Sequence, residues 1–148
     1  MKYDYYKKIE IAPDFETFDF ISDGLRGAIH KRIFFELIHE QDIYNLAFGD
    51  LSEDGTVDDY SISDNKDMAK VLATIAAAIN IFLNKYPYRK VFFRGSTVER
   101  TRLYRMAISI NYEELSANYH IDGILENGRI VNFEKNLHYD GFVISKKS

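Results

Sequence analysis

The sequence predicts an α+β fold, in which a mostly antiparallel, twisted sheet carries two main helices packed on it. Three observations support this fold class. Apolar and polar residues alternate through much of residues 15–48, as in strands that bury one face. Residues 68–82 and 103–110 instead repeat apolar residues every three or four positions, as in amphipathic helices. Asp54-Gly55 and Asn127-Gly128 are dipeptides typical of hairpin turns. The predicted order is ββββα followed by βαββ, with one further short strand at the end.

Four strands are predicted in the N-terminal half. The first begins at Phe15, has Thr17 or Phe18 and then Phe20 on its buried side, and breaks at residues 22–24. The next two strands each place their apolar residues on one side: Ile29, Ile33, Phe35 and Leu37, then Tyr44, Leu46 and Phe48. The turn at Asp54-Gly55 leads to a short acidic strand marked by Tyr60 and Ile62. We expect this fourth strand at an edge of the sheet.

The first predicted helix has an apolar stripe formed by Met68, Val71, Leu72, Ile75, Ile79 and Phe82. Asp64 or Asn65 is suited to cap its N-terminus, and Pro87 follows its end. A strand over residues 91–94 then stops at Gly95. Ser96 and Glu99 form a capping box that begins a second helix. The apolar face of this second helix is Leu103, Met106, Ala107 and Ile110.

The last third of the chain returns to strands. A short turn of helix is expected over residues 113–118. Two strands, over residues 119–125 and 129–133, are then joined by Asn127-Gly128 in what the dipeptide predicts to be a type I′ turn. Residues 142–144 form a final strand.

Length and composition favour a single domain over residues 1–148. The chain is 46% hydrophobic, has two prolines, and contains no repeat or low-complexity linker. It has no cysteine, which excludes disulfides, thiolate metal sites and cysteine nucleophiles and favours a cytoplasmic location. The first 15 residues contain no apolar h-region, and the apolar segment 71–83 is too short for a membrane span, so neither secretion nor membrane association is expected.

Charge is unevenly distributed along the chain. Residues 1–74 contain 8 Lys and Arg against 16 Asp and Glu, whereas residues 75–148 contain 11 against 7. The acidic stretch 50–67 begins like a calcium-binding EF-hand loop, but Ser61 stands where the bidentate glutamate is needed and helices do not flank it. A solvated hairpin is the favoured interpretation, and Asp58-Asp59 is the one doublet to test for Mg²⁺. No metal and no cofactor are expected.

The segments "YNLAFGD", "VLATIAAAI" and "FRGSTVERTRLYR" resemble a family of uncharacterised bacterial proteins of about 150 residues, common in Bacteroidetes and classed as a domain of unknown function. The resemblance covers nearly the whole chain. It implies a cytoplasmic bacterial single-domain protein and identifies no catalytic residue. The ββββα order of residues 15–84 is also similar in topology to the repeat of PUR-type single-strand nucleic-acid binders, although no diagnostic motif of that family is present.

The strongest candidate site lies in the segment from Arg94 to Arg105. A strand that ends in glycine and opens a helix directs backbone N–H groups towards an anion, and arginine adds paired donors suited to phosphate. The predicted anion- or nucleic-acid-binding residues are Arg94, Ser96, Thr97, Arg100, Arg102 and Arg105. Helical projection places Arg102 and Arg105 on one flank and Arg100 on the other. The alternative is a capped helix whose arginines cover neighbouring rings such as Tyr104.

A wider nucleic-acid surface would add basic residues and stacking rings from the preceding segment. These residues are Lys85, Arg89 and Lys90 with Tyr86, Tyr88 and Tyr104. The isoelectric point of about 5.6 argues against a dedicated nucleic-acid binder, because such proteins are usually basic.

Two histidine–carboxylate pairs, His120-x-Asp122 and His138-x-Asp140, place an imidazole and a carboxylate on one face of a strand. Such a pair could serve as a general base or as part of a metal site, but a histidine more often has a structural role. The sequence lacks the P-loop motif and the G-x-S-x-G elbow, which argues against P-loop NTPases and serine hydrolases.

Three functional hypotheses follow, and the catalytic residues stay unknown. The favoured one is a non-enzymatic binding or adaptor protein that uses the arginines to recognise single-stranded nucleic acid, another anion or a protein partner. The second is a small enzyme acting on a phosphorylated metabolite. The third is a regulatory partner, similar to members of toxin–antitoxin pairs, that acts through the acidic stretch.

Overall fold

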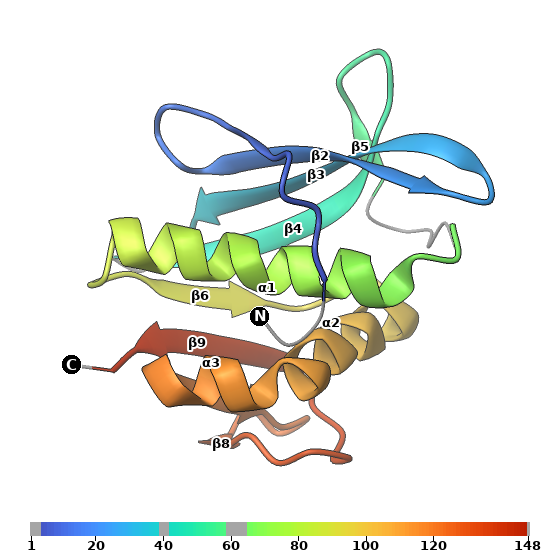
Figure 1. The fold of residues 1–148 in the computed structure, drawn as a ribbon. Helices are drawn as coiled ribbons and strands as arrows, with labels where there is room; N and C mark the ends of the chain where they lie inside the picture. Colours follow the sequence, from blue (N-terminus) through green and yellow to red (C-terminus); the bar gives the residue numbers. More distant parts are fainter. Residues whose placement is uncertain (1–3, 39–41, 59–64, 148) are drawn as a thin grey trace.

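The computed structural model describes residues 4–38, 42–58 and 65–147 and confirms the α+β fold (Figure 1). The strands are β1 (Glu10–Ile11), β2 (Thr17–Gly24), β3 (Gly27–Leu37), β4 (Ile43–Leu51), β5 (Val57–Asp58), β6 (Lys90–Phe93), β7 (Tyr119–Ile124), β8 (Ile130–Asn132) and β9 (Gly141–Lys146). The helices are α1 (Met68–Lys85), α2 (Val98–Ile110) and α3 (Tyr112–Asn118). Tyr60 and Ile62, which marked the predicted fourth strand, lie outside the described residues.

The strands form one sheet in the order β1-β2-β3-β4-β6-β9-β7-β8, with β5 beside β4. Every pairing in the described part of this sheet is antiparallel except that of β4 with β6, which is parallel. The parallel pairing follows from the connection, because α1 carries the chain back along the sheet before β6 begins. The C-terminal strand β9 then enters between β6 and β7.

All three helices lie on the same face of the sheet (Figure 1). The period-two pattern explains this: Phe18, Ile33 and Leu46 alternate with partly exposed neighbours and are almost completely buried under α1. Phe82 of α1 stacks on Phe35 of β3, with ring centroids 4.0 Å apart. Phe18, rather than Thr17, is therefore the inward residue of β2. Leu37 continues the inward series of β3 but is 61% exposed.

The start of α1 differs from the prediction. Its N-cap position is Asp67, which makes no side-chain capping bond, and Asp64 lies outside the described residues. The Asn65 side chain instead closes the β2–β3 hairpin: its Oδ1 accepts from the Arg26 backbone N–H (2.6 Å) and its amide donates to the Gly27 carbonyl (2.9 Å). A capping residue and a hairpin-closing residue are both short and polar, so the sequence could not distinguish these roles.

The β7–β8 hairpin is present, but its turn is not type I′. The Leu125 N–H donates to the Arg129 carbonyl across three loop residues, and Gly128 alone has a left-handed φ, of 85°. A type I′ turn needs positive φ at two successive residues, and Asn127 does not supply the first. The chain thus uses the three-residue hairpin in which glycine takes the left-handed position.

By length and composition alone, α1 is a helix that could span a membrane, a test that a buried core helix also passes. Of its 18 residues, 61% are buried inside the structure. On α2 the buried residues are Arg100, Leu103, Tyr104, Ala107 and Ile108. The predicted apolar face of α2 included Met106, which is 42% exposed, so the buried face is rotated from the predicted one.

Candidate anion-binding pocket

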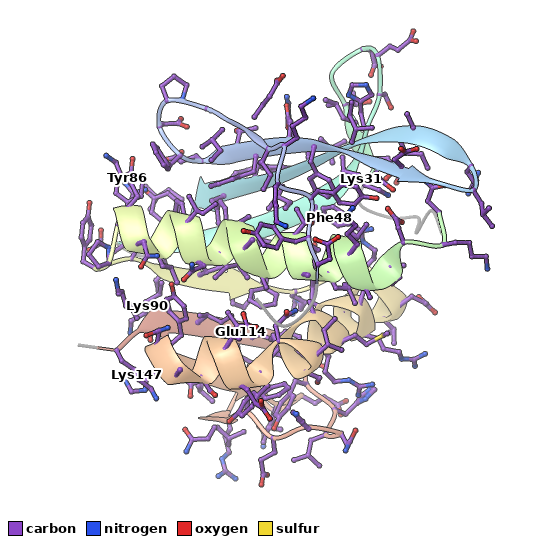
Figure 2. The ribbon with its side chains drawn as sticks, in the orientation of Figure 1. Lys31, Phe48, Tyr86, Lys90, Glu114 and Lys147 are labelled. Carbon is purple, nitrogen blue, oxygen red and sulfur yellow. The ribbon has the colours of Figure 1, made fainter. Side chains whose placement is uncertain are left out.

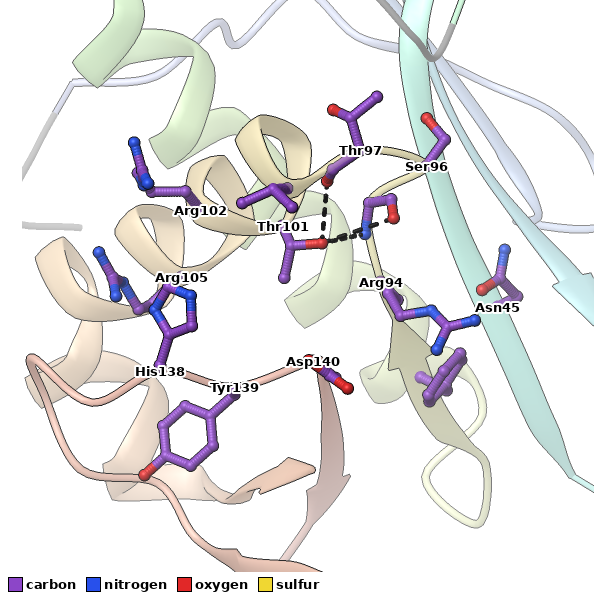
Figure 3. A pocket seen from close by; sticks show the side chains of 13 residues that line it. Asn45, Arg94, Ser96, Thr97, Thr101, Arg102, Arg105, His138, Tyr139 and Asp140 are labelled. Carbon is purple, nitrogen blue, oxygen red and sulfur yellow. Dashed lines mark hydrogen bonds between the residues drawn. The ribbon is translucent and has the colours of Figure 1, made fainter. Parts of the chain in front are cut away.

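A cavity of about 690 Å³ opens where β6 ends and α2 begins (Figure 3). Residues from β4, the β6–α2 turn, the exposed flank of α2 and the loop before β9 line it. Five of the six predicted site residues are among them: Arg94, Ser96, Thr97, Arg102 and Arg105. His138 and Asp140 line the same cavity. Sequence reasoning had treated the arginines and this histidine pair as separate candidates.

The turn that shapes the pocket depends on Gly95. A Cβ at this position would lie 2.3 Å from the Thr101 backbone nitrogen and 2.4 Å from the Arg100 Cβ, so only glycine lets α2 fold back this closely. The Gly95 N–H donates to the Thr101 hydroxyl (3.0 Å), which in turn donates to the Thr97 carbonyl (3.1 Å). These two bonds join the end of β6 to the first turn of α2 (Figure 3).

The N-cap of α2 is Thr97, and the predicted capping box of Ser96 with Glu99 is wrong by one residue. The Thr97 hydroxyl accepts from the Arg100 backbone N–H at 3.2 Å, three positions along the helix, as an N-cap does. The contact of Gly95 with Thr101 decides at which residue α2 begins. The capping-box motif spans residues 96–99 and includes neither of these two residues. Ser96 and Thr97 both have capping hydroxyls, so sequence alone favoured the wrong one.

Arg100 does not belong to the pocket. Its side chain is 3% exposed, and its guanidinium carbon lies 5.3 Å from the centroid of the Phe48 ring on the helix-covered side. The prediction that Arg100 contributes to an exposed arginine patch is therefore corrected. A signal was available: Arg100 precedes Leu103, Tyr104, Ala107 and Ile108 at intervals of three, four, seven and eight residues, which is the spacing of one buried helical face.

Arg102 and Arg105 lie together on the opposite flank of α2, as helical projection predicted. Arg105 is also tied to the other wall, because its Nη1 donates to the Leu137 carbonyl at 3.3 Å. Leu137 directly precedes His138. This bond fixes the distance between the arginine flank of α2 and the loop that carries the histidine.

The loop before β9 is anchored by Tyr139. Its ring packs against Phe133 and Phe142, and its hydroxyl accepts from the Glu134 backbone N–H at 2.9 Å. Because Tyr139 is buried, its neighbours His138 and Asp140 are left exposed on the pocket side. The Asp140 N–H donates to the Ile124 carbonyl at 2.7 Å, which attaches the loop to β7. His138 and Asp140 therefore lie in an anchored loop and not, as predicted, on a strand.

The second pair, His120 and Asp122, lies on β7 and does not line the pocket. The described residues contain no group of three or more histidine, cysteine or acidic side chains that could hold a metal ion. The two histidine pairs thus form no joint metal centre in this part of the chain. Asp59 of the acidic doublet lies outside the described residues.

The basic residues before Arg94 serve another part of the molecule. The Arg89 guanidinium carbon lies 3.6 Å from the centroid of the Tyr86 ring and 4.2 Å from that of Tyr44, and its Nη1 is 3.5 Å from the Glu16 carboxylate. Figure 2 places Tyr86 and Lys90 at one end of α1, away from Phe48, whose ring lies 5.3 Å from the Arg100 guanidinium carbon. Tyr104, a predicted stacking ring, is buried against Phe93.

Several acids of the stretch 50–67 bond within the chain, among them Asp50, Asp54 and Asp67, whose carboxylate accepts from the hydroxyls of Tyr6 and Ser22. Asp50 forms an ion pair of 2.6 Å with the buried amine of Lys31. Asp54 accepts from the backbone N–H and the hydroxyl of Thr56, and these hydrogen bonds lower the pKa of its carboxyl. The prediction of a regulatory partner that acts through this stretch stays a prediction, since residues 59–64 lie outside the described chain.

Comparisons with known proteins identify the family. No curated protein and no solved structure gives a match to the chain. The sequence model of one family, described as the family of unknown function DUF6934, matches residues 2–147. The match covers almost the entire sequence, so the chain belongs to the family of unknown function DUF6934.

Proposed function

We propose that this protein binds a small anionic molecule, with phosphate or carboxylate oxygens, in the pocket between β6 and α2. The observation that carries the proposal is that Arg94, Arg102 and Arg105 line one cavity. Among the described residues that line it, Asp140 has the only carboxylate. The local charge is therefore positive although the formal net charge of the chain is −4.

Arginine suits this role because its planar guanidinium donates two parallel hydrogen bonds to phosphate or carboxylate oxygens. The cavity volume of about 690 Å³ lies within the range of sites for small molecules. Ser96 and Thr97 line the same cavity, and a hydroxyl can donate to the oxygens of such a ligand.

A short pocket supports a small ligand better than a long nucleic-acid strand. A strand-binding surface needs a continuous basic groove with aromatic faces along it. Here Arg89 is engaged by Tyr44, Tyr86 and Glu16, and Tyr104 is buried. Lys90 lies at the far end of β6 from Arg94, about 13 Å away at the rise of an extended strand.

Thermal unfolding in the presence of anions tests the proposal. Inorganic phosphate, ribose 5-phosphate and citrate serve as probes, and a ligand at 100 times its Kd adds about 2.7 kcal/mol to the free energy of unfolding. For a chain of this length that gain raises Tm by roughly 5–10 °C. We expect a shift with at least one probe, and its loss in the double variant Arg102→Gln and Arg105→Gln.

The matched control removes the same charge elsewhere. Arg26 and Arg129 are exposed and do not line the cavity, so the variant Arg26→Gln and Arg129→Gln should keep the full shift. An equal loss in both double variants would mean that net charge, and not the pocket, causes the shift. Absence of any shift with every probe would refute the proposal.

A second function, an enzyme acting on a phosphorylated metabolite, is supported by one observation: His138 lines the same cavity as the arginines. An imidazole next to a bound phosphate group can donate or accept the proton that a reaction requires. Release of inorganic phosphate from a panel of phosphomonoesters tests hydrolysis. In that case His138→Ala abolishes turnover but keeps the thermal shift, whereas absence of turnover in the wild-type protein rules out hydrolysis of those compounds.

A further inference from the structure

The part of the pocket that lies on the sheet has a different character from its arginine wall. Asn45 of β4 and Phe92 of β6 are direct neighbours in the parallel pairing of these strands, and both line the cavity. Val91 and Phe93 are completely buried towards the helices, so Phe92 faces the opposite, helix-free side and is partly exposed there. One end of the pocket therefore presents an aromatic ring beside a side-chain amide.

Gly141 lies next to this ring. Phe142 of β9 pairs with Phe93, so Gly141 lies beside the end of β6 on the same helix-free face as Phe92. A Cβ at Gly141 would lie 3.4 Å from Phe92 Cε2 and 3.6 Å from Arg94 Cβ. With no side chain at this position, the Phe92 ring and the Cβ of Arg94 both lie beside the buried backbone of Gly141. A glycine inside a strand often marks the close approach of a ligand or another backbone.

Arg94 joins the two halves of the pocket. It follows Phe92 by two residues and so faces the same side of the sheet. Figure 3 shows its side chain extending towards Asn45, with Asp140 between Arg94 and His138. A ligand in this cavity thus meets the Phe92 ring, the Asn45 amide and Arg94 at one end, Arg102 and Arg105 at the other, and the Asp140 carboxylate between them.

We infer that the anion recognised by this pocket is a nucleoside phosphate. This inference rests on the proposed function and specifies its ligand. The base lies on the Phe92 ring, and the Asn45 amide hydrogen-bonds the edge of the base. Asp140 accepts from the ribose hydroxyls, Arg102 and Arg105 hold the phosphate, and Arg94 lies beside the base. Each chemical part of a nucleotide then has a matching group, whereas a simple phosphate or carboxylate would leave Phe92 and Asn45 unused.

Isothermal titration compares AMP, GMP, CMP and UMP with ribose 5-phosphate, which has the same sugar phosphate without a base. We expect at least one nucleotide to bind fivefold or more tightly than ribose 5-phosphate, since stacking of a base on an aromatic ring has at least this effect. A tetranucleotide with a 5′-phosphate distinguishes a free nucleotide from the end of a strand. Tighter binding of the tetranucleotide would assign the same nucleoside phosphate to a strand end, and weaker binding would assign it to a free nucleotide.

Two variants test the base platform. Phe92→Leu keeps an apolar side chain but removes the aromatic face, and it should weaken nucleotide binding about fivefold or more without changing the Kd for ribose 5-phosphate. Gly141→Ala places a methyl group at ordinary contact distances and should have the same selective effect. The double variant Arg102→Gln and Arg105→Gln should weaken both ligands, and Arg26→Gln with Arg129→Gln should weaken neither.

The outcomes separate the two proposals. If ribose 5-phosphate binds and no nucleotide binds more tightly, the nucleotide inference is overturned and the anion pocket stands. Equal weakening of both ligands by Phe92→Leu would also overturn it, because the ring would then support the pocket without contacting a base. If neither class of ligand binds, both proposals fail.

Discussion

The substitution Gly95→Ala gives the sharpest test of how the pocket is built. The added Cβ would lie 2.3 Å from the Thr101 nitrogen, 2.4 Å from the Arg100 Cβ and 2.5 Å from the Arg100 carbonyl carbon. Two of these atoms belong to the backbone of α2, so a side-chain rotation cannot relieve the contact. Either the first turn of α2 or the end of β6 has to move.

The expected cost lies at the upper end of the range for overpacking, about 3 kcal/mol in the free energy of unfolding. For a chain of this length, that loss lowers Tm by roughly 6–12 °C. Urea unfolding followed by circular dichroism measures the free energy directly, with an unchanged m-value if only the native state is affected. Movement of α2 would also displace Arg102 and Arg105, so anion binding should weaken together with stability.

Gly141→Ala is the matched control, because both glycines lie at the end of β6. Its Cβ would meet Phe92 and the Phe93 carbonyl at 3.4 Å, an ordinary contact. We expect its stability to stay within about 0.5 kcal/mol of the wild-type value, as for most substitutions that create no clash. Equal stability of the two variants would refute the view that contact of Gly95 with α2 fixes the turn.

Two further predictions concern single hydrogen-bonded groups. Thr97→Ala should lower the free energy of unfolding by about 1 kcal/mol, as loss of an N-cap does. In the same urea titration, Ser96→Ala should lower the free energy of unfolding by less. If Ser96→Ala is the more destabilising variant, Ser96 is the N-cap after all. Burial and a hydrogen bond to the Asp67 carboxylate raise the pKa of Tyr6. The neutral form of Tyr6 therefore stabilises the folded state at pH values below the unfolded pKa of about 10. This contribution is lost as the pH rises through the folded pKa. In unfolding experiments between pH 8 and 11, the stability difference between the wild-type protein and Tyr6→Phe should shrink with rising pH, and a constant difference would contradict the assignment.

Local spacing was enough to predict most of the secondary structure. Alternation at Ile33, Phe35 and Leu46 requires only that one face of a strand is buried, and the stripe on α1 requires only a helical period. Both signals depend on residues a few positions apart, so they are visible without any knowledge of the fold. The flank shared by Arg102 and Arg105 was predictable for the same reason. The burial of Arg100 could have been predicted too, because Arg100 has the helical spacing of the buried residues of α2. Its charge was given more weight than this spacing.

Residues far apart in sequence form the pocket, and only the tertiary structure could bring them together. The parallel pairing of β4 with β6 places Asn45 beside Phe92, and the entry of β9 next to β6 brings Gly141 against Arg94. Burial of Tyr139 then holds His138 opposite Arg105. These neighbours are set by which faces bury the most apolar surface when the whole sheet assembles, a property of all strands together. The sequence by itself therefore determined the strands, the helices and the arginine flank, whereas the folded sheet decided which of those arginines share a cavity.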